Sequence, residues 1–218
     1  RTNKIYSPFP EEANRQLISR LADLHFSPTD LSKKNLIKEN ISKEKIFIVG
    51  NTAIDSLFYT LKNIKKNYSD FDFKNRMPFI QHCYNKKIVL VTSHRRENYG
   101  VGFKNICEAL KNISNISKDI VIIYSVHLNP KIKNYVNRTL KNIDNIFLIS
   151  PLNYLDFVKL MDLSYIILTD SGGIQEEAPS LGKPVIVMRE FTERPEAVKA
   201  GTVKVLGSNK IKIFNCAK

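Results

Sequence analysis

Residues 169–190, TDSGGIQEEAPSLGKPVIVMRE, place two glycines and two carboxylates directly after an apolar run. The upstream residues 164–169, SYIILT, form a short β-branched stretch that is typical of a buried strand. Residues 174–181 predict a short helix ended by Gly182, and the run PVIVM from Pro184 predicts a second buried strand. Strand, turn, helix and strand make a βαβ unit, so the glycine turn lies at the carboxyl edge of a parallel sheet.

The turn at Gly172 and Gly173 has the chemistry of an anion site. Free amides in the first turn of a helix and the positive end of the helix dipole attract anions, and glycine lets a phosphate approach the backbone. Glu177 lies about 7.5 Å further along the axis at roughly 1.5 Å per residue, which suits a carboxylate binding the ribose of a nucleotide. The alternative is an ordinary βα turn followed by a solvated pair of glutamates, and the spacing alone leaves both readings open.

The same alternation of strand and helix extends through most of the chain. It predicts an α/β fold with a doubly wound parallel sheet. The predicted strands are residues 88–92, 119–127 and 145–150, and the predicted helices are residues 102–114, 131–143 and 153–164.

The N-terminal part has a different pattern. Residues 10–26 carry a helical period that puts five apolar side chains on one face: Ala13, Leu17, Ile18, Leu21 and Leu24. A short capped helix, a strand and an amphipathic helix are expected next, in residues 27–40, 45–51 and 51–67, and residues 68–87 are expected to be irregular and peripheral. We therefore divide the chain into residues 1–50, the end of a first domain, residues 51–87, a connecting segment, and residues 88–218, a second domain.

Polar residues gather where the predicted strands end. They are His94, His127, Asp170, Glu190 and Arg194. In an open α/β sheet these strand ends share one ligand-binding edge. A lone histidine there is often structural, but several polar strand ends on one edge favour a site.

Composition limits the other classes of function. The chain has 43% hydrophobic and 25% charged residues, as a globular protein does, and no apolar run approaches the roughly 20 residues that span a bilayer. The net charge of +13 comes from dispersed lysines rather than from a basic block, so we do not expect nucleic-acid binding. Cys83, Cys107 and Cys216 lack metal-ligand spacing and indicate free thiols in a reducing, cytoplasmic setting, and we expect no metal and no cofactor.

Six motifs together resemble the non-hydrolysing UDP-N-acetylglucosamine 2-epimerases of bacteria. They are RTNKIYSPFPEEANR (1–15), HFSPT (25–29), VTSHRREN (91–98), VHLNP (126–130), LTDSGGIQEEAPSLGKPV (168–185) and MREFTERPEAVKAGT (188–202). The resemblance implies two Rossmann-like domains in the arrangement called GT-B, a cytoplasmic homodimer, and a role in supplying polysaccharide biosynthesis. It also implies interconversion of UDP-GlcNAc and UDP-ManNAc, in which UDP is eliminated to give 2-acetamidoglucal and is then added back.

The resemblance assigns roles to residues at matching motif positions. Glu11 would take part in proton transfer, and His94 would contact the nucleotide-sugar. Arg194 would also serve the substrate. The remaining assignments concern UDP: the diphosphate would be held by Ser171, Gly172 and Gly173, the ribose by Glu177, and the uracil would lie beside Phe157.

The chain departs from the family pattern in three respects. The family's N-terminal domain begins long before Arg1, the family's terminal helices are missing, and Ser125 and Leu152 stand where relatives tend to have Pro and Gln. The resemblance therefore implies a fragment that lacks most of the first domain. The alternatives are an inactive nucleotide-binding remnant, and a GT-B glycosyltransferase or hydrolysing epimerase built on the same plan.

Overall fold

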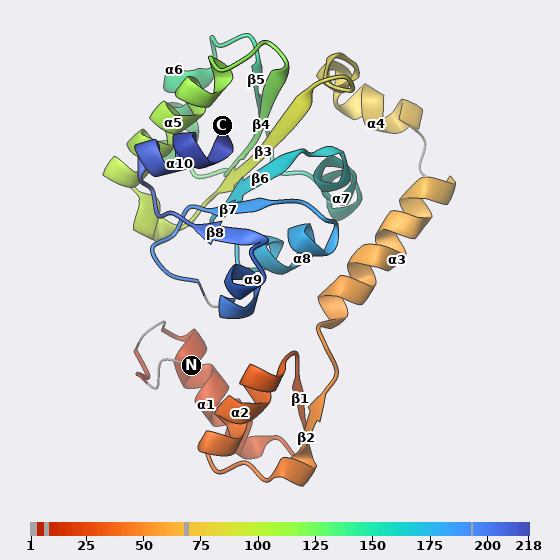
Figure 1. Ribbon diagram of the computed structural model, residues 1–218, viewed down its shortest axis with the longest axis vertical. Coiled ribbons are helices and arrows are strands. Elements are labelled where there is room, and N and C mark those ends of the chain that lie inside the picture. The colour runs from red at the N-terminus through yellow and green to blue at the C-terminus, as the bar shows by residue number, and fades with distance from the viewer. Residues whose placement is uncertain (1–3, 7–8, 68–69, 193) are drawn as a thin grey trace. The chain divides into compact units, whose positions relative to one another are not determined.

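The structure is a computed structural model that describes residues 4–6, 9–67, 70–192 and 194–218 (Figure 1). The chain divides into two compact units, Arg1–Asp55 and Ser56–Lys218.

The larger unit is built on a six-stranded parallel sheet with the order β5-β4-β3-β6-β7-β8. Its strands are β3 (Lys87–Ser93), β4 (Ile120–Val126), β5 (Ile146–Ile149), β6 (Ile166–Thr169), β7 (Val185–Val187) and β8 (Val203–Val205). The chain runs outward from β3 to β5, returns to the other side of β3 at β6, and runs outward again. This is the doubly wound order, so the predicted α/β class and parallel sheet are confirmed.

Helices cover both faces of this sheet, as Figure 1 shows. One face is covered by α5 (Val101–Ser114), α6 (Pro130–Leu140) and α10 (Lys210–Ala217), and the other by α3 (Thr52–Asn67), α4 (Asp70–Arg76), α7 (Tyr154–Leu163) and α8 (Ile174–Ser180). Successive strand residues point to opposite faces, so Val89 belongs to the first core and Leu90 to the second. Burial on both faces explains why these strands are continuous apolar runs. A short helix, α9 (Pro195–Lys199), precedes β8.

The expectation that residues 68–87 are irregular and peripheral was wrong for the part that the structure describes. Helix α4 is followed by a 3₁₀ helix, η2 (Pro78–His82). Their apolar side chains lie in the core on the face of the sheet that α7 and α8 cover. Phe73, Ile80 and Cys83 are fully buried. The interspersed polar residues obscured a core-facing pattern in a segment too short to show a clear period.

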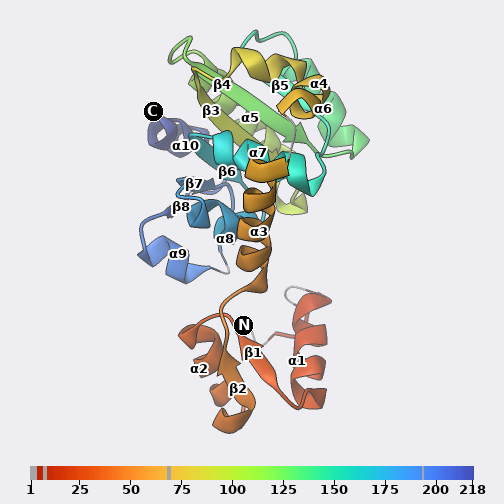
Figure 2. The ribbon, with the colours of Figure 1, turned by 90° about the vertical axis from the view of Figure 1, so that its right-hand side faces the viewer.

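The smaller unit contains a two-stranded parallel sheet and two helices, α1 (Glu11–Leu21) and α2 (Asp30–Lys38), which Figure 2 shows from the side. Strand β1 (His25–Ser27) pairs with β2 (Ile46–Ile48), and a 3₁₀ turn, η1 (Lys43–Lys45), leads into β2. The predicted first helix therefore ends five residues earlier than residue 26, and its last part is a strand. Helix α2 is capped, as predicted, because the Thr29 side chain accepts a hydrogen bond from the Ser32 amide, and it begins at Asp30 inside the predicted range of residues 27–40.

The apolar face of α1 is exposed in this chain. Leu17, Ile18 and Leu21 are 65%, 63% and 84% exposed, whereas the buried residues of the helix are Glu12 and Ser19. Ala13, Leu17, Ile18 and Leu21 lie in α1, as predicted, whereas Leu24 lies beyond the end of the helix. Exposed apolar side chains gathered on one face favour association with another surface.

The three cysteines are free, and two are deeply placed. Burial raises the pKa of the Cys83 thiol and raises that of Cys107 to about 12. Cys216 lies in α10 and is only partly buried.

Replacing the exposed leucines of α1 tests this reading. Because Leu17 and Leu21 contribute little buried area, the double variant Leu17→Gln/Leu21→Gln is expected to change the free energy of unfolding by no more than about 0.5 kcal/mol. It is expected to reduce self-association, measured by sedimentation velocity. Leu36→Ala is the control, since Leu36 is buried and its truncation costs about 2–5 kcal/mol. An equal loss of stability in both variants would show that the face of α1 carrying Leu17 and Leu21 is buried in the folded chain.

Candidate functional site

The site lies where the strand order reverses. Strands β3 and β6 are neighbours in the sheet but are followed by segments on opposite sides of it, and ligands of open α/β sheets bind at such a point. The two strands are held in register by the Thr92–Thr169 pair, whose hydroxyl oxygens are 2.7 Å apart. The residues that follow each strand therefore meet at the carboxyl edge.

Asp170 is the centre of this edge. It is fully buried, and its carboxylate accepts hydrogen bonds from Ser93 Oγ (2.7 Å), the amides of His94 (3.0 Å) and Arg95 (3.0 Å), and Asn98 Nδ2 (3.1 Å). All these donors belong to the segment that leaves β3. One buried carboxylate thus fixes the course of the loop between β3 and α5.

The two predicted strand-end histidines come together. Nδ1 of His94 lies 3.2 Å from Oδ1 of Asp170, and the rings of His94 and His127 are roughly parallel with centroids 6.1 Å apart. The structure therefore brings three of the predicted polar strand ends to one place. Asn98 was not singled out from the sequence; its amide also reaches the Met188 carbonyl at 3.1 Å and so ties the loop to the end of β7.

The glycine turn opens helix α8. Gly173 is the residue before its first turn, and a side chain added there would meet no atom within 4 Å. The Ser171 amide donates to Thr169 Oγ1 at 3.0 Å, which makes the turn compact. Two glutamates follow in the first turn, Glu176 and Glu177. The backbone at this turn is thus approachable, as the anion-site hypothesis requires.

Glu177 is partly buried and contacts helix α7. The Tyr154 hydroxyl donates to its Oε1 at 3.2 Å, and partial burial raises the pKa of the Glu177 carboxyl, an effect that the tyrosine hydrogen bond partly offsets. Burial and the neighbouring carboxylate raise the pKa of the Tyr154 hydroxyl. Phe157, one turn further along α7, is partly buried against the core. Tyr154 was not singled out from the sequence.

Helix α7 is anchored at its N-terminus by a buried carboxylate. Asp156 accepts two hydrogen bonds from the Arg76 guanidinium of α4, at 2.9 and 3.1 Å. Asn153 caps the helix by accepting from the Asp156 amide at 2.9 Å. This fork-shaped pair holds the helix that carries Tyr154 and Phe157 in place.

Arg194 is engaged with a carboxylate of the same site. It precedes α9 and forms an ion pair with Glu176 of α8. Thr192 hydrogen-bonds the Gln175 side chain, so the segment before α9 is tied to the first turn of α8. Glu190 lies close to Gly207, and a side chain added at Gly207 would clash with the Glu190 carboxylate.

Glu11 belongs to the smaller unit. It is exposed in the first turn of α1, where the helix dipole favours a carboxylate. The adjacent Glu12 is buried and paired with Arg15. His94, Phe157, Ser171, Gly172, Gly173, Glu177 and Arg194 all belong to the larger unit, whereas Glu11 belongs to the smaller one.

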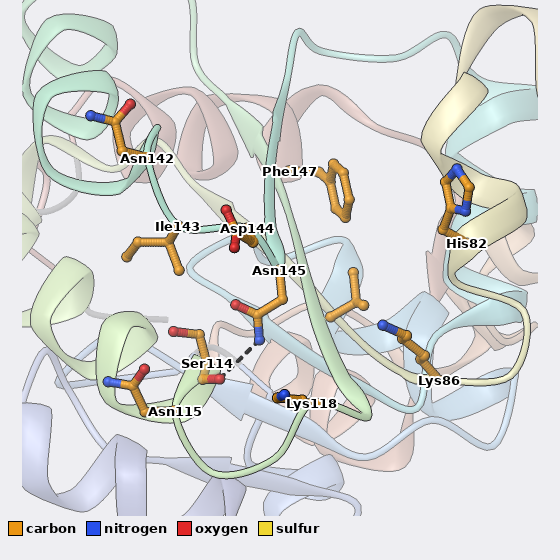
Figure 3. A pocket seen from close by; sticks show the side chains of 11 residues that line it. His82, Lys86, Ser114, Asn115, Lys118, Asn142, Ile143, Asp144, Asn145 and Phe147 are labelled. Carbon is orange, nitrogen blue, oxygen red and sulfur yellow. Dashed lines mark hydrogen bonds between the residues drawn. The ribbon is translucent and has the colours of Figure 1, made fainter.

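The larger unit also has a hollow at the other edge of its sheet, shown in Figure 3. It has a volume of about 680 Å³ and lies at the amino ends of β3, β4 and β5. Its lining includes Lys86, Lys118, Asn145 and Phe147. It contains none of the predicted site residues.

In the parts of the chain that the structure describes, no group of three or more His, Cys, Asp or Glu side chains is placed to hold a metal ion. No helix within the same residues is long and apolar enough to cross a membrane.

Fold and site together define an α/β protein of the doubly wound class, with a polar site at the switch point of its sheet. A family profile described as UDP-N-acetylglucosamine 2-epimerase matches residues 1–218. The chain therefore belongs to the UDP-N-acetylglucosamine 2-epimerase family.

Individual relatives agree with this membership. The UDP-N-acetylglucosamine 2-epimerase of Campylobacter jejuni is 57% identical over 98% of this chain, which covers 56% of that relative. The Neisseria meningitidis UDP-GlcNAc 2-epimerase, solved bound to UDP-GlcNAc, is 48% identical with a TM-score of 0.90, over 99% of this chain and 58% of that one. The S. aureus MnaA–UDP structure is 45% identical with a TM-score of 0.87, and the match covers 100% of this chain and 56% of that one. The chain thus spans little more than half the length of these relatives.

The raised pKa of Glu177 predicts a pH-dependent stability. The folded state binds the carboxyl proton more tightly than the unfolded state, so the wild type loses stability as the pH rises above the ordinary glutamate value of 4.5. Glu177→Gln keeps an acceptor for Tyr154 and removes this loss. We expect the variant to be more stable than wild type at pH 7 and equal to it below about pH 4, where the wild-type carboxyl is also neutral.

Urea unfolding across this pH range measures the difference. Tyr154→Phe is the matched variant, because it removes the hydrogen bond that lowers the pKa of Glu177 and should steepen the dependence. A Glu177→Gln protein that is less stable than wild type at pH 7 would contradict a raised pKa of the Glu177 carboxyl.

Proposed function

We propose that this chain is part of an enzyme that interconverts UDP-GlcNAc and UDP-ManNAc. The observation that carries the proposal is the family match over residues 1–218. The polar cluster of His94, His127 and Asp170 at the switch point of the sheet supports it. Relatives solved with UDP-GlcNAc or UDP support the same ligand class.

The proposed UDP site is local to the larger unit. The amides at Ser171, Gly172 and Gly173 would bind the diphosphate, since the turn is approachable and opens a helix. Glu177 would accept hydrogen bonds from the ribose hydroxyls, and Phe157 would lie beside the uracil. Tyr154 supports the first of these roles because it already orients the Glu177 carboxylate.

The proposed reaction is an elimination followed by an addition. Glu11 would take the proton from C2, the bond from C1 to the UDP oxygen would break, and 2-acetamidoglucal would form. UDP would then add back to C1 while C2 gains a proton on the opposite face. Proton transfer at carbon requires a positioned acid or base, and departing UDP requires donors for its growing charge, which His94 and Arg194 would supply.

Three alternatives keep the same nucleotide site. A hydrolysing epimerase would release free UDP and ManNAc, and a glycosyltransferase would move the sugar to an acceptor. An inactive remnant would bind UDP without turnover. Product analysis by NMR separates them, because only the proposed reaction returns UDP-ManNAc from UDP-GlcNAc.

Cytoplasmic location, a homodimer and the division into residues 1–50, 51–87 and 88–218 are part of the same proposal. The dispersed lysines and the free thiols support a cytoplasmic protein that binds neither nucleic acid nor membrane. The exposed apolar face of α1 supports association with a further protein surface.

UDP binding is the first test. The chain is expected to bind UDP, and Glu177→Ala is expected to weaken binding by about 1–3 kcal/mol, the usual cost of losing a charge-assisted hydrogen bond. Calorimetry measures both affinities. Glu108→Ala is the control, since Glu108 pairs with Lys210 at the surface and is not one of the predicted site residues. Identical UDP affinity of wild type and Glu177→Ala would show that Glu177 does not bind the ribose.

Proton transfer is the second test. A chimera joins the N-terminal part of the Campylobacter jejuni relative to this chain, which supplies the length that the relatives have. In it, Glu11→Gln is expected to lower kcat by about 10²–10⁴ with little change in substrate binding, because the variant keeps the shape and removes the proton acceptor. Deuterium entering C2 from solvent gives the readout. If deuterium enters C2 in Glu11→Gln at the wild-type rate, Glu11 takes no part in proton transfer and is only a carboxylate in the first turn of a helix.

A further inference from the structure

We propose that Asp170 is a positioning residue that holds the ring proton of His94 on Nδ1, so that Nε2 is the nitrogen available to a ligand. The part of this inference that concerns catalysis rests on the proposed function. The tautomer itself follows from the contacts of two side chains.

The surroundings of Asp170 require an acceptor. Its side chain is fully buried, and the groups that face Oδ2 are all donors: Ser93 Oγ, the amides of His94 and Arg95, and Asn98 Nδ2. An ionised carboxylate is acceptor-only and satisfies several donors at once. A hydroxyl proton on this group would face other donors, so the arrangement fits the carboxylate form.

Oδ1 is the oxygen that faces the histidine. It lies 3.1 Å from the His94 amide and 3.2 Å from Nδ1 of the ring. A bare Nδ1 would place its lone pair against this oxygen, whereas an N–H at Nδ1 is attracted to it. The neutral ring therefore carries its proton on Nδ1, and Nε2 has a free lone pair.

This choice of tautomer decides what His94 can do. The side chain is 42% exposed, so a ligand at the carboxyl edge can reach Nε2. Nε2 can accept a proton from the substrate or from water and, once protonated, donate to a departing phosphate. With the proton on Nε2 from the start, Nε2 could only donate, because the lone pair of the neutral ring would then be on Nδ1. Asp170 thus sets the role of His94 without touching the substrate, as a carboxylate behind a histidine does in other enzymes.

A purely structural role for Asp170 gives a different expectation. If the carboxylate only anchors the loop after β3, the ring proton of His94 has no preferred nitrogen. A change at Asp170 would then affect the position of that proton no more than the removal of any one of its hydrogen-bond donors. If Asp170 fixes the tautomer, only a change at Asp170 itself inverts it.

The variant Asp170→Asn separates these cases. Four donors converge on Oδ2, so the amide oxygen takes that position and the amide NH₂ faces Nδ1. Nδ1 then becomes the acceptor and the proton moves to Nε2. Ser93→Ala is the matched control, because it removes a hydrogen bond to the same carboxylate and leaves Oδ1 and the ring in place.

Nitrogen-15 NMR at a pH where the ring is neutral reads the tautomer directly, since a protonated ring nitrogen and a bare one resonate far apart. The chain has four histidines, so assignment through His94→Gln is practicable. We expect protonated Nδ1 in wild type and Ser93→Ala, and protonated Nε2 in Asp170→Asn. A wild-type ring protonated on Nε2 overturns the proposal, and this spectrum decides even if Asp170→Asn fails to fold.

Titration with UDP extends the test. We expect UDP to shift the Nε2 resonance of wild type far more than Nδ1. A protonated Nδ1 with no response to UDP would leave the role of Asp170 intact and contradict the placement of His94 in the nucleotide site. The failure of one proposal is thus distinguishable from the failure of the other.

Discussion

A buried carboxylate has to be met by donors, and in this protein that requirement organises the site. Asp170 follows β6, and its partners lie at the end of β3 and in the residues after it, so the ends of the two central strands are joined by one charged group. Leaving such a group without partners costs about 1–3 kcal/mol for each lost interaction and more for a charge. The segment after β3 has little freedom to adopt another course, and with it the position of His94 is fixed.

The sequence predicts the sheet and its edge well, because both depend on local patterns. Buried parallel strands are continuous apolar runs, and right-handed crossovers leave few ways to arrange them. His94, His127 and Asp170 were thus expected on one edge. The contacts among these three residues were not expected. They depend on the pairing of Thr92 with Thr169, and no local sequence pattern encodes such a long-range register. Tyr154 and Arg76 escaped notice for the same reason.

The N-terminal part shows a different limit. A helical period in α1 indicates which side chains share a face, but whether the face is covered depends on surfaces far away in the sequence. Leu24 continued the period by chance, since the chain had already left the helix for β1. Phe73 and Ile80 were missed because a core can be reached by a single short turn, which carries no period at all. Family membership states what the chain is related to, while these residues show which contacts this particular chain makes.

The uneven placement of the thiols makes the chain convenient to label. Alkylating reagents attack the thiolate, and burial keeps Cys83 and Cys107 both protonated and out of reach. Cys216, partly exposed on α10, is then the group that a maleimide dye modifies first. Helix α10 packs beside α5, the helix that follows the loop held by Asp170. A fluorophore there would report on that loop in the natural sequence, with no cysteine added or removed.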